Sequence, residues 1–292
     1  AMGSETMKAT TTGAGNSAFG KGALRFNTTG ADNAAVGRQA LQSNTTGAQN
    51  VAMGTCALFT QSSGGNSNVS VGNYSMKLNT TGDNNVAVGY SALCKNTTAG
   101  SNTAVGHSAL FDNTTGGTNT ALGTSSLENN TTGGSNVAVG YNSLSSNTTG
   151  ANNVAVGYSA LALNNTGQNV AVGNHAFKSV TGAEGGVAVG HCAGAGITSG
   201  ANNIAIGKCA GCTTTSGIAN IAIGFLALKA AATNNDEIVL GNQSTGKGAA
   251  TAFINAYGGP VYAGNNSANF STTSDRSCLL YTSDAADDLL CV

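Results

Sequence analysis

A glycine that closes a short apolar segment recurs along most of this chain at a nearly constant spacing. Successive glycines are 17 residues apart, except for one step of 18 and one of 16. The fourteen glycines are Gly20, Gly37, Gly54, Gly72, Gly89, Gly106, Gly123, Gly140, Gly157, Gly173, Gly190, Gly207, Gly224 and Gly241. Such regularity identifies a repeat architecture, in which each short unit buries its apolar face by stacking on its neighbours.

The unit is too short for a pair of helices, and the valines and isoleucines before each glycine favour strands. We therefore predict an all-β fold, a parallel β-solenoid (β-roll) of about fourteen 17-residue coils with two short strands per coil. At about 4.8 Å per coil, fourteen coils make a rod roughly 65 Å long.

The apolar positions of the unit predict an inside and an outside. Residues one and three places before the glycine, such as Val86 and Val88, share one face of a strand, and the small residue between them, Ala87, lies on the other. We expect these valines to fill the interior together with the leucine four places after the glycine, such as Leu93. The alanines would then form a smooth outer stripe that packs against another sheet, so we expect the chains to associate, most plausibly as a homotrimer.

Two kinds of asparagine recur in register. Those directly before the strand are expected to form a hydrogen-bonded ladder between coils, and they are Asn33, Asn50, Asn85, Asn136, Asn153, Asn203 and Asn220. The others open the turn sequence Asn-Thr-Thr-Gly, for example at residues 113–116. Asparagine and glycine tolerate left-handed backbone angles, so we assign this turn to a tight corner.

Composition excludes several classes of function. Only 8% of the residues are charged and the net charge is −1, so nothing favours nucleic acid or an acidic membrane surface as a partner. No apolar run approaches the roughly 18 residues that span a bilayer, and we expect no membrane insertion. The sequence contains no phosphate-binding loop, nucleophile elbow or calcium-binding nonapeptide run. We therefore expect no enzyme activity, no cofactor and no metal.

The repeats divide the chain into four parts. Residues 1–15 are interpreted as an expression scar, Ala1–Ser4, followed by a lead-in to the repeats. Residues 16–242 form the solenoid, residues 243–276 are a connector, and residues 277–292 match nothing before them. We interpret this last part as a non-native read-through tail.

Residues 79–93 (NTTGDNNVAVGYSAL) and 147–161 (NTTGANNVAVGYSAL) resemble the head repeats of trimeric autotransporter adhesins and, more closely, the repeats of bacteriophage tail fibres. The resemblance covers about residues 16–242, although the adhesin unit is usually shorter than 17 residues. It implies a left-handed parallel β-roll assembled as a homotrimer. It also implies an attachment device on a virion tail or cell surface, with a host-surface receptor or glycan as partner.

A second resemblance follows the repeats. Residues Phe253–Arg276 resemble the junction before the self-cleaving intramolecular chaperone of phage tail spikes and fibres. The resemblance implies cleavage between Ser274 and Asp275 after trimer assembly. The family continues with Arg-Leu-Lys, whereas here Ser277 and Cys278 follow Arg276. The assisting lysine is thus missing, the chaperone does not follow, and we expect no proteolytic activity.

The position directly after the glycine varies in chemistry from coil to coil, so we expect it to be exposed and to hold any receptor contacts. The candidate binding residues in this row are Tyr90, His107, Tyr141, Tyr158 and His191. An alternative is ice binding, because threonines stacked at solenoid spacing can match an ice lattice. The residues for that alternative are Thr28, Thr45, Thr80, Thr97, Thr114 and Thr148. A passive fibre spacer with no receptor is a third possibility.

Cysteine also recurs in one slot, two places after the glycine, at Cys56, Cys192 and Cys209. Cys192 and Cys209 occupy neighbouring coils, about 4.8 Å apart, within the usual disulfide Cα range of about 4.4–6.8 Å. Cys209 and Cys212 form a C-x-x-C motif without a second pair. We favour small apolar packing for these cysteines over a zinc or redox centre, and leave the disulfide state of Cys192 and Cys209 open.

Overall fold

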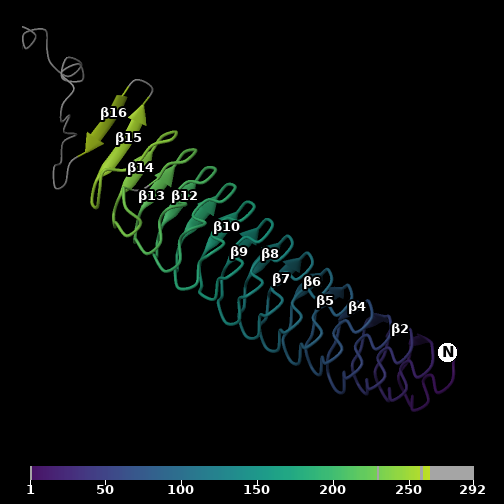
Figure 1. The fold of residues 1–292 in the computed structure, drawn as a ribbon. Coiled ribbons are helices and arrows are strands. Elements are labelled where there is room, and N and C mark those ends of the chain that lie inside the picture. Colours follow the sequence, from purple (N-terminus) through teal and green to yellow (C-terminus); the bar gives the residue numbers. More distant parts are fainter. Residues whose placement is uncertain (1, 229, 257–258, 264–292) are drawn as a thin grey trace, which may run out of the picture.

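The computed structural model shows a long rod of stacked coils and describes residues 2–228, 230–256 and 259–263 (Figure 1). The strands of successive coils form one sixteen-stranded sheet whose order follows the sequence. The pairing is parallel and without slip as far as β15, so Val137 lies opposite Val154 and Ala138 opposite Ala155. The strands are β1 (Ser17–Phe19), β2 (Ala34–Val36), β3 (Val51–Met53), β4 (Val69–Val71), β5 (Val86–Val88), β6 (Thr103–Val105), β7 (Thr120–Leu122), β8 (Val137–Val139), β9 (Val154–Val156), β10 (Val170–Val172), β11 (Val187–Val189), β12 (Ile204–Ile206), β13 (Ile221–Ile223), β14 (Ile238–Leu240), β15 (Ala252–Ala256) and β16 (Gly259–Ala263).

The predicted fold class is confirmed: the described residues form a parallel β-solenoid of about fourteen turns and contain no helix. The prediction of two strands per coil is wrong, because each coil contributes one three-residue strand and turns fill the rest. Left-handed residues make these turns, as at Ser108 (φ 53°) and Leu110 (φ 52°) after β6. Gly106, which ends β6, has φ 135°, and a Cβ there would lie 2.6 Å from the backbone of Gly123 in the next coil. Glycine is therefore required at this corner.

The expected faces of the strand are reversed. The central alanine of the strand is fully buried, as for Ala104, whereas Val105 beside it is 37% exposed. The valines therefore do not fill the interior, and the alanines do not form an outer stripe. A Cβ at Gly211, which occupies the leucine slot of its coil, would lie 3.3 Å from the Ala205 Cβ. The leucine slot thus faces the alanine row, and the strand positions opposite it have room for only a methyl group.

The inward orientation of the leucines is confirmed. Fully buried members of this row are Leu24, Leu41, Leu58, Leu93, Leu110, Leu127, Leu144 and Leu161. Leu228, near the end of the repeats, is only partly buried. Leucine, two alanines and two asparagines per coil therefore make up most of the interior.

The predicted asparagine ladder is present before the strands. The side-chain oxygen of Asn33 accepts from the Asn50 side chain at 3.1 Å and from the Asn50 backbone N–H at 3.0 Å. A second ladder, which the sequence analysis did not predict, runs through the first residue of the Asn-Thr-Thr-Gly turn. Asn113 donates to the side-chain oxygen of Asn96 at 3.0 Å and to the carbonyl of Gly116 at 2.9 Å. The two ladders satisfy most of these buried amides, and among the described residues Asn102 Nδ2 and Asn147 Oδ1 are ladder atoms left without a partner.

The core changes after β10. Phe177 occupies the leucine slot, while the next coil carries Gly194 in that slot and Gly186 in place of the asparagine before the strand. A Cβ at Gly194 would lie 2.3 Å from Phe177 Cε1, and one at Gly186 would lie 2.8 Å from Phe177 Cε2. The phenylalanine ring therefore fills the space that two larger side chains leave in the next coil.

The two coils of unusual length differ from the others in the same turn. The 18-residue coil carries Gly64 as its additional residue, and a Cβ there would meet nothing within 4 Å. The 16-residue coil is shortened between Asn164 and Gly167, where the Thr166 carbonyl accepts the Asn153 side chain at 2.8 Å. The ladder before the strands passes both coils, since Asn68 donates to Asn50 and Asn169 to Asn153. The turn ladder is interrupted at both coils, where Gln61 Oε1 and Asn147 Oδ1 have no partner among the described residues.

The sheet continues past the predicted limits of the repeats at both ends. Met2 and Met7 donate backbone hydrogen bonds to the first coil, to Ala18 and Ala23, each at 3.1 Å. The predicted lead-in thus stacks on the solenoid. In the predicted connector, β15 pairs in parallel with β14, and β16 pairs antiparallel with β15. The predicted cleavage residues Ser274 and Asp275, and the predicted tail, lie outside the described residues.

Candidate binding surfaces

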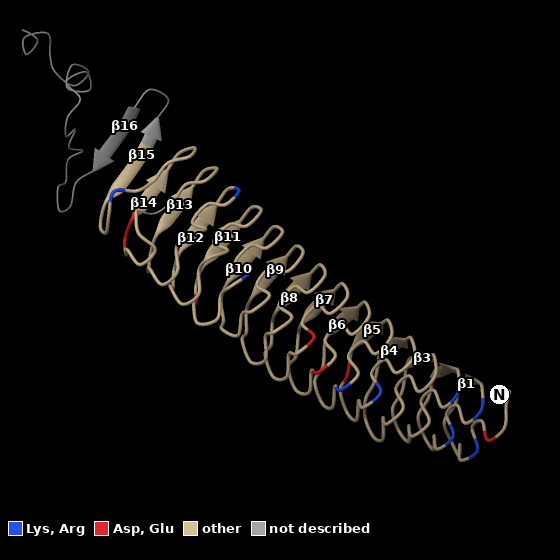
Figure 2. Cartoon of the chain, viewed as in Figure 1, with Lys and Arg blue, Asp and Glu red and all other residues tan. Residues whose placement is uncertain are grey.

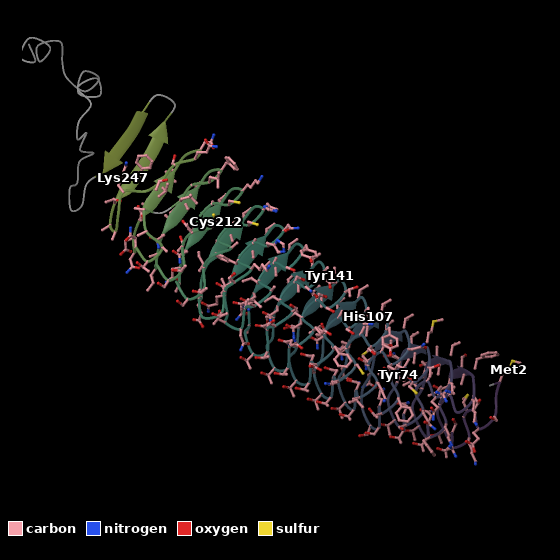
Figure 3. The ribbon with its side chains drawn as sticks, viewed as in Figure 1. Met2, Tyr74, His107, Tyr141, Cys212 and Lys247 are labelled. Carbon is pink, nitrogen blue, oxygen red and sulfur yellow. The ribbon has the colours of Figure 1, made fainter. Side chains whose placement is uncertain are left out.

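The predicted contact row lies exposed along one side of the rod. Tyr90 is 51% exposed, Tyr141 and Tyr158 are exposed to a similar extent, and His107 and His191 are exposed as well. Figure 3 labels His107 and Tyr141 at separate points along the rod. Each coil contributes one side chain to this row, because the glycine before it ends the strand at the same place in every coil.

Within this row the rings stack on one another. The rings of Tyr90 and His107 lie 5.3 Å apart with an angle of 11° between their planes. Tyr141 and Tyr158 stack in the same way, at 5.3 Å and 16°. The spacing between coils is close to that of offset-stacked rings, so neighbouring aromatic residues in this slot stack without displacing the backbone.

Two further rings extend these pairs, and the sequence analysis missed them. Tyr74 meets Tyr90 edge to face at 5.8 Å, and His175 meets Tyr158 edge to face at 5.2 Å. Tyr74 and His175 sit one residue further along their coils than the predicted row, which is why the row did not contain them. The structure thus forms two groups of three rings, and His191 belongs to neither.

The environment of His175 disfavours its charged form. Burial lowers the pKa of His175 below its ordinary value of 6.5, and the nearby Lys178 and His191 lower it further. His175 therefore favours the neutral form in the folded chain, and its ring nitrogens offer one donor and one acceptor.

Charged side chains are sparse, and several of them lie near the N-terminus (Figure 2). There Arg25 pairs with Glu5 at 2.9 Å, beside a cavity of about 130 Å³ that Lys21 and Arg38 also line. This exposed pair contributes little to stability. Its cluster does not extend along the rod, so it differs from the repeated surfaces.

The predicted threonine row is partly buried, and its hydroxyls bond to the neighbouring coil. Thr97 Oγ1 donates to the carbonyl of Thr114 at 3.1 Å, and Thr80 donates to that of Thr97 at 2.9 Å. Thr28, Thr45, Thr114 and Thr148 donate in the same direction. The second threonine of each turn is the exposed one, as at Thr29, Thr46, Thr81, Thr98, Thr115, Thr132 and Thr149.

The outer face of the sheet is an apolar surface that runs along the rod. Its largest members are the third residues of the strands, and those with more than a third of their surface exposed are Phe19, Val36, Met53, Val105, Leu122, Val172, Val189, Ile206 and Ile223. The first residues of the strands, mostly valine or isoleucine, lie partly exposed beside them. Contiguous apolar surface of this extent is typical of interaction sites.

Three side chains on the coils after β11 and β12 bring possible metal ligands together. The ligand atoms of His191, Cys192 and Cys209 all lie within 4.8 Å of one another, and the three cysteines Cys192, Cys209 and Cys212 are partly exposed. Burial raises the pKa of the Cys192 thiol, and the neighbouring Cys209 raises it further. Burial also raises the pKa of Cys212, again with a contribution from Cys209. Cys56 differs from them, because it is buried in its coil.

Comparisons with protein-family models, with curated proteins and with solved structures find no match to this chain. The described residues include no helix with the length and hydropathy of a membrane span.

Proposed function

We propose that this chain is the shaft of a homotrimeric adhesive fibre, carried on a virion tail or a cell surface and used for attachment. The observation that carries the proposal is the apolar outer face of the sheet, which extends over the successive coils. The resemblance of the repeats to those of tail fibres and trimeric adhesins supports the same function. In this proposal the chain acts by display and catalyses no reaction.

The apolar face supports self-association because of its shape and regularity. Strands of only three residues leave a narrow stripe in which the third residue is apolar in every coil and the first is valine or isoleucine in most. Face-to-face sheets pack about 10 Å apart when their side chains interdigitate. Three identical stripes that meet on a common axis would remove the aliphatic side chains from water along the whole shaft.

The ring groups support attachment. Tyrosine combines an apolar face with a polar tip and is enriched where proteins recognise partners. In a trimer, each group of three rings, such as Tyr141, Tyr158 and His175, would occur three times at the same height. Weak contacts made simultaneously by such copies add through avidity.

Light scattering on the purified chain tests the assembly. We expect the unchanged protein to be a trimer and the triple variant Val105→Lys, Leu122→Lys, Val139→Lys to be a monomer, because three lysines on one stripe repel their copies. The matched control places lysines in the exposed turns, at Thr98, Thr115 and Thr132, and stays trimeric. A strictly monomeric unchanged protein would refute the fibre proposal.

Binding to host cells and to a glycan array tests the attachment part. Tyr141→Ala combined with Tyr158→Ala removes one stacked pair and should weaken binding while the trimer persists. If intact trimers bind no cell or glycan, the chain is a passive spacer.

Ice binding remains the second candidate, supported by the exposed second threonines. Thr81, Thr98, Thr115, Thr132 and Thr149 follow one another in five successive coils, so their side chains repeat along the rod at the spacing of the coils. A thermal hysteresis gap that disappears when Thr98, Thr115 and Thr132 are changed to lysine would favour this function over adhesion. Absence of hysteresis would exclude it.

A further inference from the structure

We propose that His191, Cys192, Cys209 and Cys212 bind a thiophilic divalent ion of the zinc class, which joins the coils after β11 and β12. This inference does not rest on the adhesive function: it uses His191 of the predicted contact row, but no member of the ring groups or of the apolar face. It also departs from our expectation that these cysteines serve as apolar packing.

Two coils supply the ligands. His191 and Cys192 directly follow Gly190, and Cys209 takes the same slot as Cys192 in the next coil. The Cys209 N–H donates to the His191 carbonyl at 2.9 Å, which fixes the two coils relative to each other. The fold therefore places one histidine and two thiols together before any ion binds.

The distances suit a tetrahedral ion after small side-chain rotations. His191 Nε2 and Cys192 Sγ lie 3.9 Å apart, and the three ligand atoms lie within 4.8 Å of one another. Zinc bonds of about 2.3 Å to sulfur place two sulfur ligands roughly 3.8 Å apart. Each ligand therefore moves by about 1 Å or less.

Three ligand atoms already converge, and we assign the fourth position to Cys212. It lies three residues after Cys209 in a C-x-x-C segment of the same coil and is partly exposed, and Figure 3 labels it on this part of the rod. Three cysteines and one histidine are a ligand set of structural zinc sites.

A disulfide between Cys192 and Cys209 fits the geometry less well. The two residues are in register on parallel coils with the same backbone angle, φ 55°. Their side chains therefore leave the backbone in parallel, and the Cβ atoms stay about one coil spacing apart, roughly 4.8 Å. Disulfides require a Cβ separation of about 3.5–4.5 Å. A disulfide would also leave His191 and Cys212 without a role.

The position of the site gives the ion a structural purpose. The coils that carry it are those in which Gly194 and Gly211 replace the buried leucine. An ion held by both coils adds a cross-link between them. Metal binding to the folded chain stabilises it because the unfolded chain does not present the ligands together.

The test uses the full chain with Cys278→Ser and Cys291→Ser, reduced and treated with a chelator, then titrated with Co²⁺ as a spectroscopic probe. We expect one Co²⁺ per chain, with the thiolate charge-transfer and tetrahedral bands of cobalt, and displacement by Zn²⁺. Cys192→Ser with Cys209→Ser should abolish these bands. Cys212→Ser should weaken binding at least about tenfold, since even outer-shell changes cost about 10–100-fold. Cys56→Ser, in the same slot of another coil, is the matched control and should leave them unchanged.

A measurement without these substitutions keeps the test decisive if a variant fails to fold. Zn²⁺ should protect Cys192, Cys209 and Cys212 from alkylation in the unchanged chain, as read by peptide mass spectrometry, whereas Mg²⁺ should not. Absence of both cobalt bands and zinc protection would overturn the proposal. Recovery of a Cys192–Cys209 disulfide from freshly isolated protein whose thiols were blocked at once would overturn it as well.

Discussion

Exchanging Phe177 and Gly194 for two leucines tests how neighbouring coils share the interior. Phe177→Leu removes three buried carbons at about 0.8 kcal/mol each, and with the cavity left behind it should cost roughly 2–4 kcal/mol. Gly194→Leu alone pushes a Cβ to 2.3 Å from the Phe177 ring. We expect about 1–3 kcal/mol for that overpacking and about 1 kcal/mol for a left-handed leucine.

The double variant should be much more stable than the sum of the two changes. Leucine at both positions would repeat the arrangement of Leu144 and Leu161, which are both fully buried. The single changes sum to roughly 4–8 kcal/mol. In the double variant the left-handed strain of about 1 kcal/mol remains, together with the space beside Gly186 that the ring had filled, so the coupling free energy should be about 3 kcal/mol or more.

Native-state hydrogen exchange is the suitable assay, because it measures the local opening of coils in an array whose global unfolding need not be two-state. The informative amides are those of Phe177, which donates to Ala193, and Gly194, which donates to Ala210. Amides near Leu110, several coils away, serve as the internal control. A coupling below about 0.5 kcal/mol would refute the idea that the ring replaces the missing leucine.

Three further predictions address the ladders, the corners and the histidine. Asn113→Asp sets a carboxylate against two buried oxygen acceptors, which raises the folded-state pKa above the ordinary Asp value of about 3.9. The variant therefore keeps its stability at a pH below about 3.9 and loses it as the pH rises through the folded-state pKa. We expect its thermal midpoint, measured relative to the unchanged protein, to be lower at pH 7 than at pH 4. Gly106→Ala should prevent stable folding, whereas Gly64→Ala, whose Cβ would lie in open space, should lower the free energy of unfolding by only about 1 kcal/mol in denaturant titrations. Equal effects of the two changes would contradict the conclusion that the close approach of the next coil requires glycine at position 106. In an NMR titration His175 should ionise below 6.5, and Lys178→Gln should raise its pKa because a neighbouring positive charge is removed. No change would mean that Lys178 does not contribute to the shift.

The sequence predicted the stacking and the leucine row because both follow directly from a 17-residue period. It could not decide which strand face points inward. The alternation of side chains along a strand shows that Val86 and Val88 share a face. Which face points inward depends on how much space the other buried side chains leave inside the coil. The buried Asn113 ladder determines that space, and we had assigned its members to corners.

One signal for the second ladder was present in the sequence. The slot of Asn113 is held by Val180 and Ile197 in two later coils, and an apolar substitute at a supposed corner indicates a buried position. The sequence contains no comparable sign of the ring groups, because Tyr74 and His175 lie two places after the glycine, one residue beyond the contact row whose rings they meet. The contact between the two positions is visible only in the structure.

The turn that absorbs both irregular coil lengths makes the rod a natural scaffold for grafting. A chain that already accepts one residue more at Gly64 and one fewer near Thr166, with the ladder before the strands intact, should accept foreign loops at the equivalent turn of any coil. Peptides inserted there in successive coils would project from the same edge at intervals of about 4.8 Å. The number of coils between two inserted peptides would then set the distance between them.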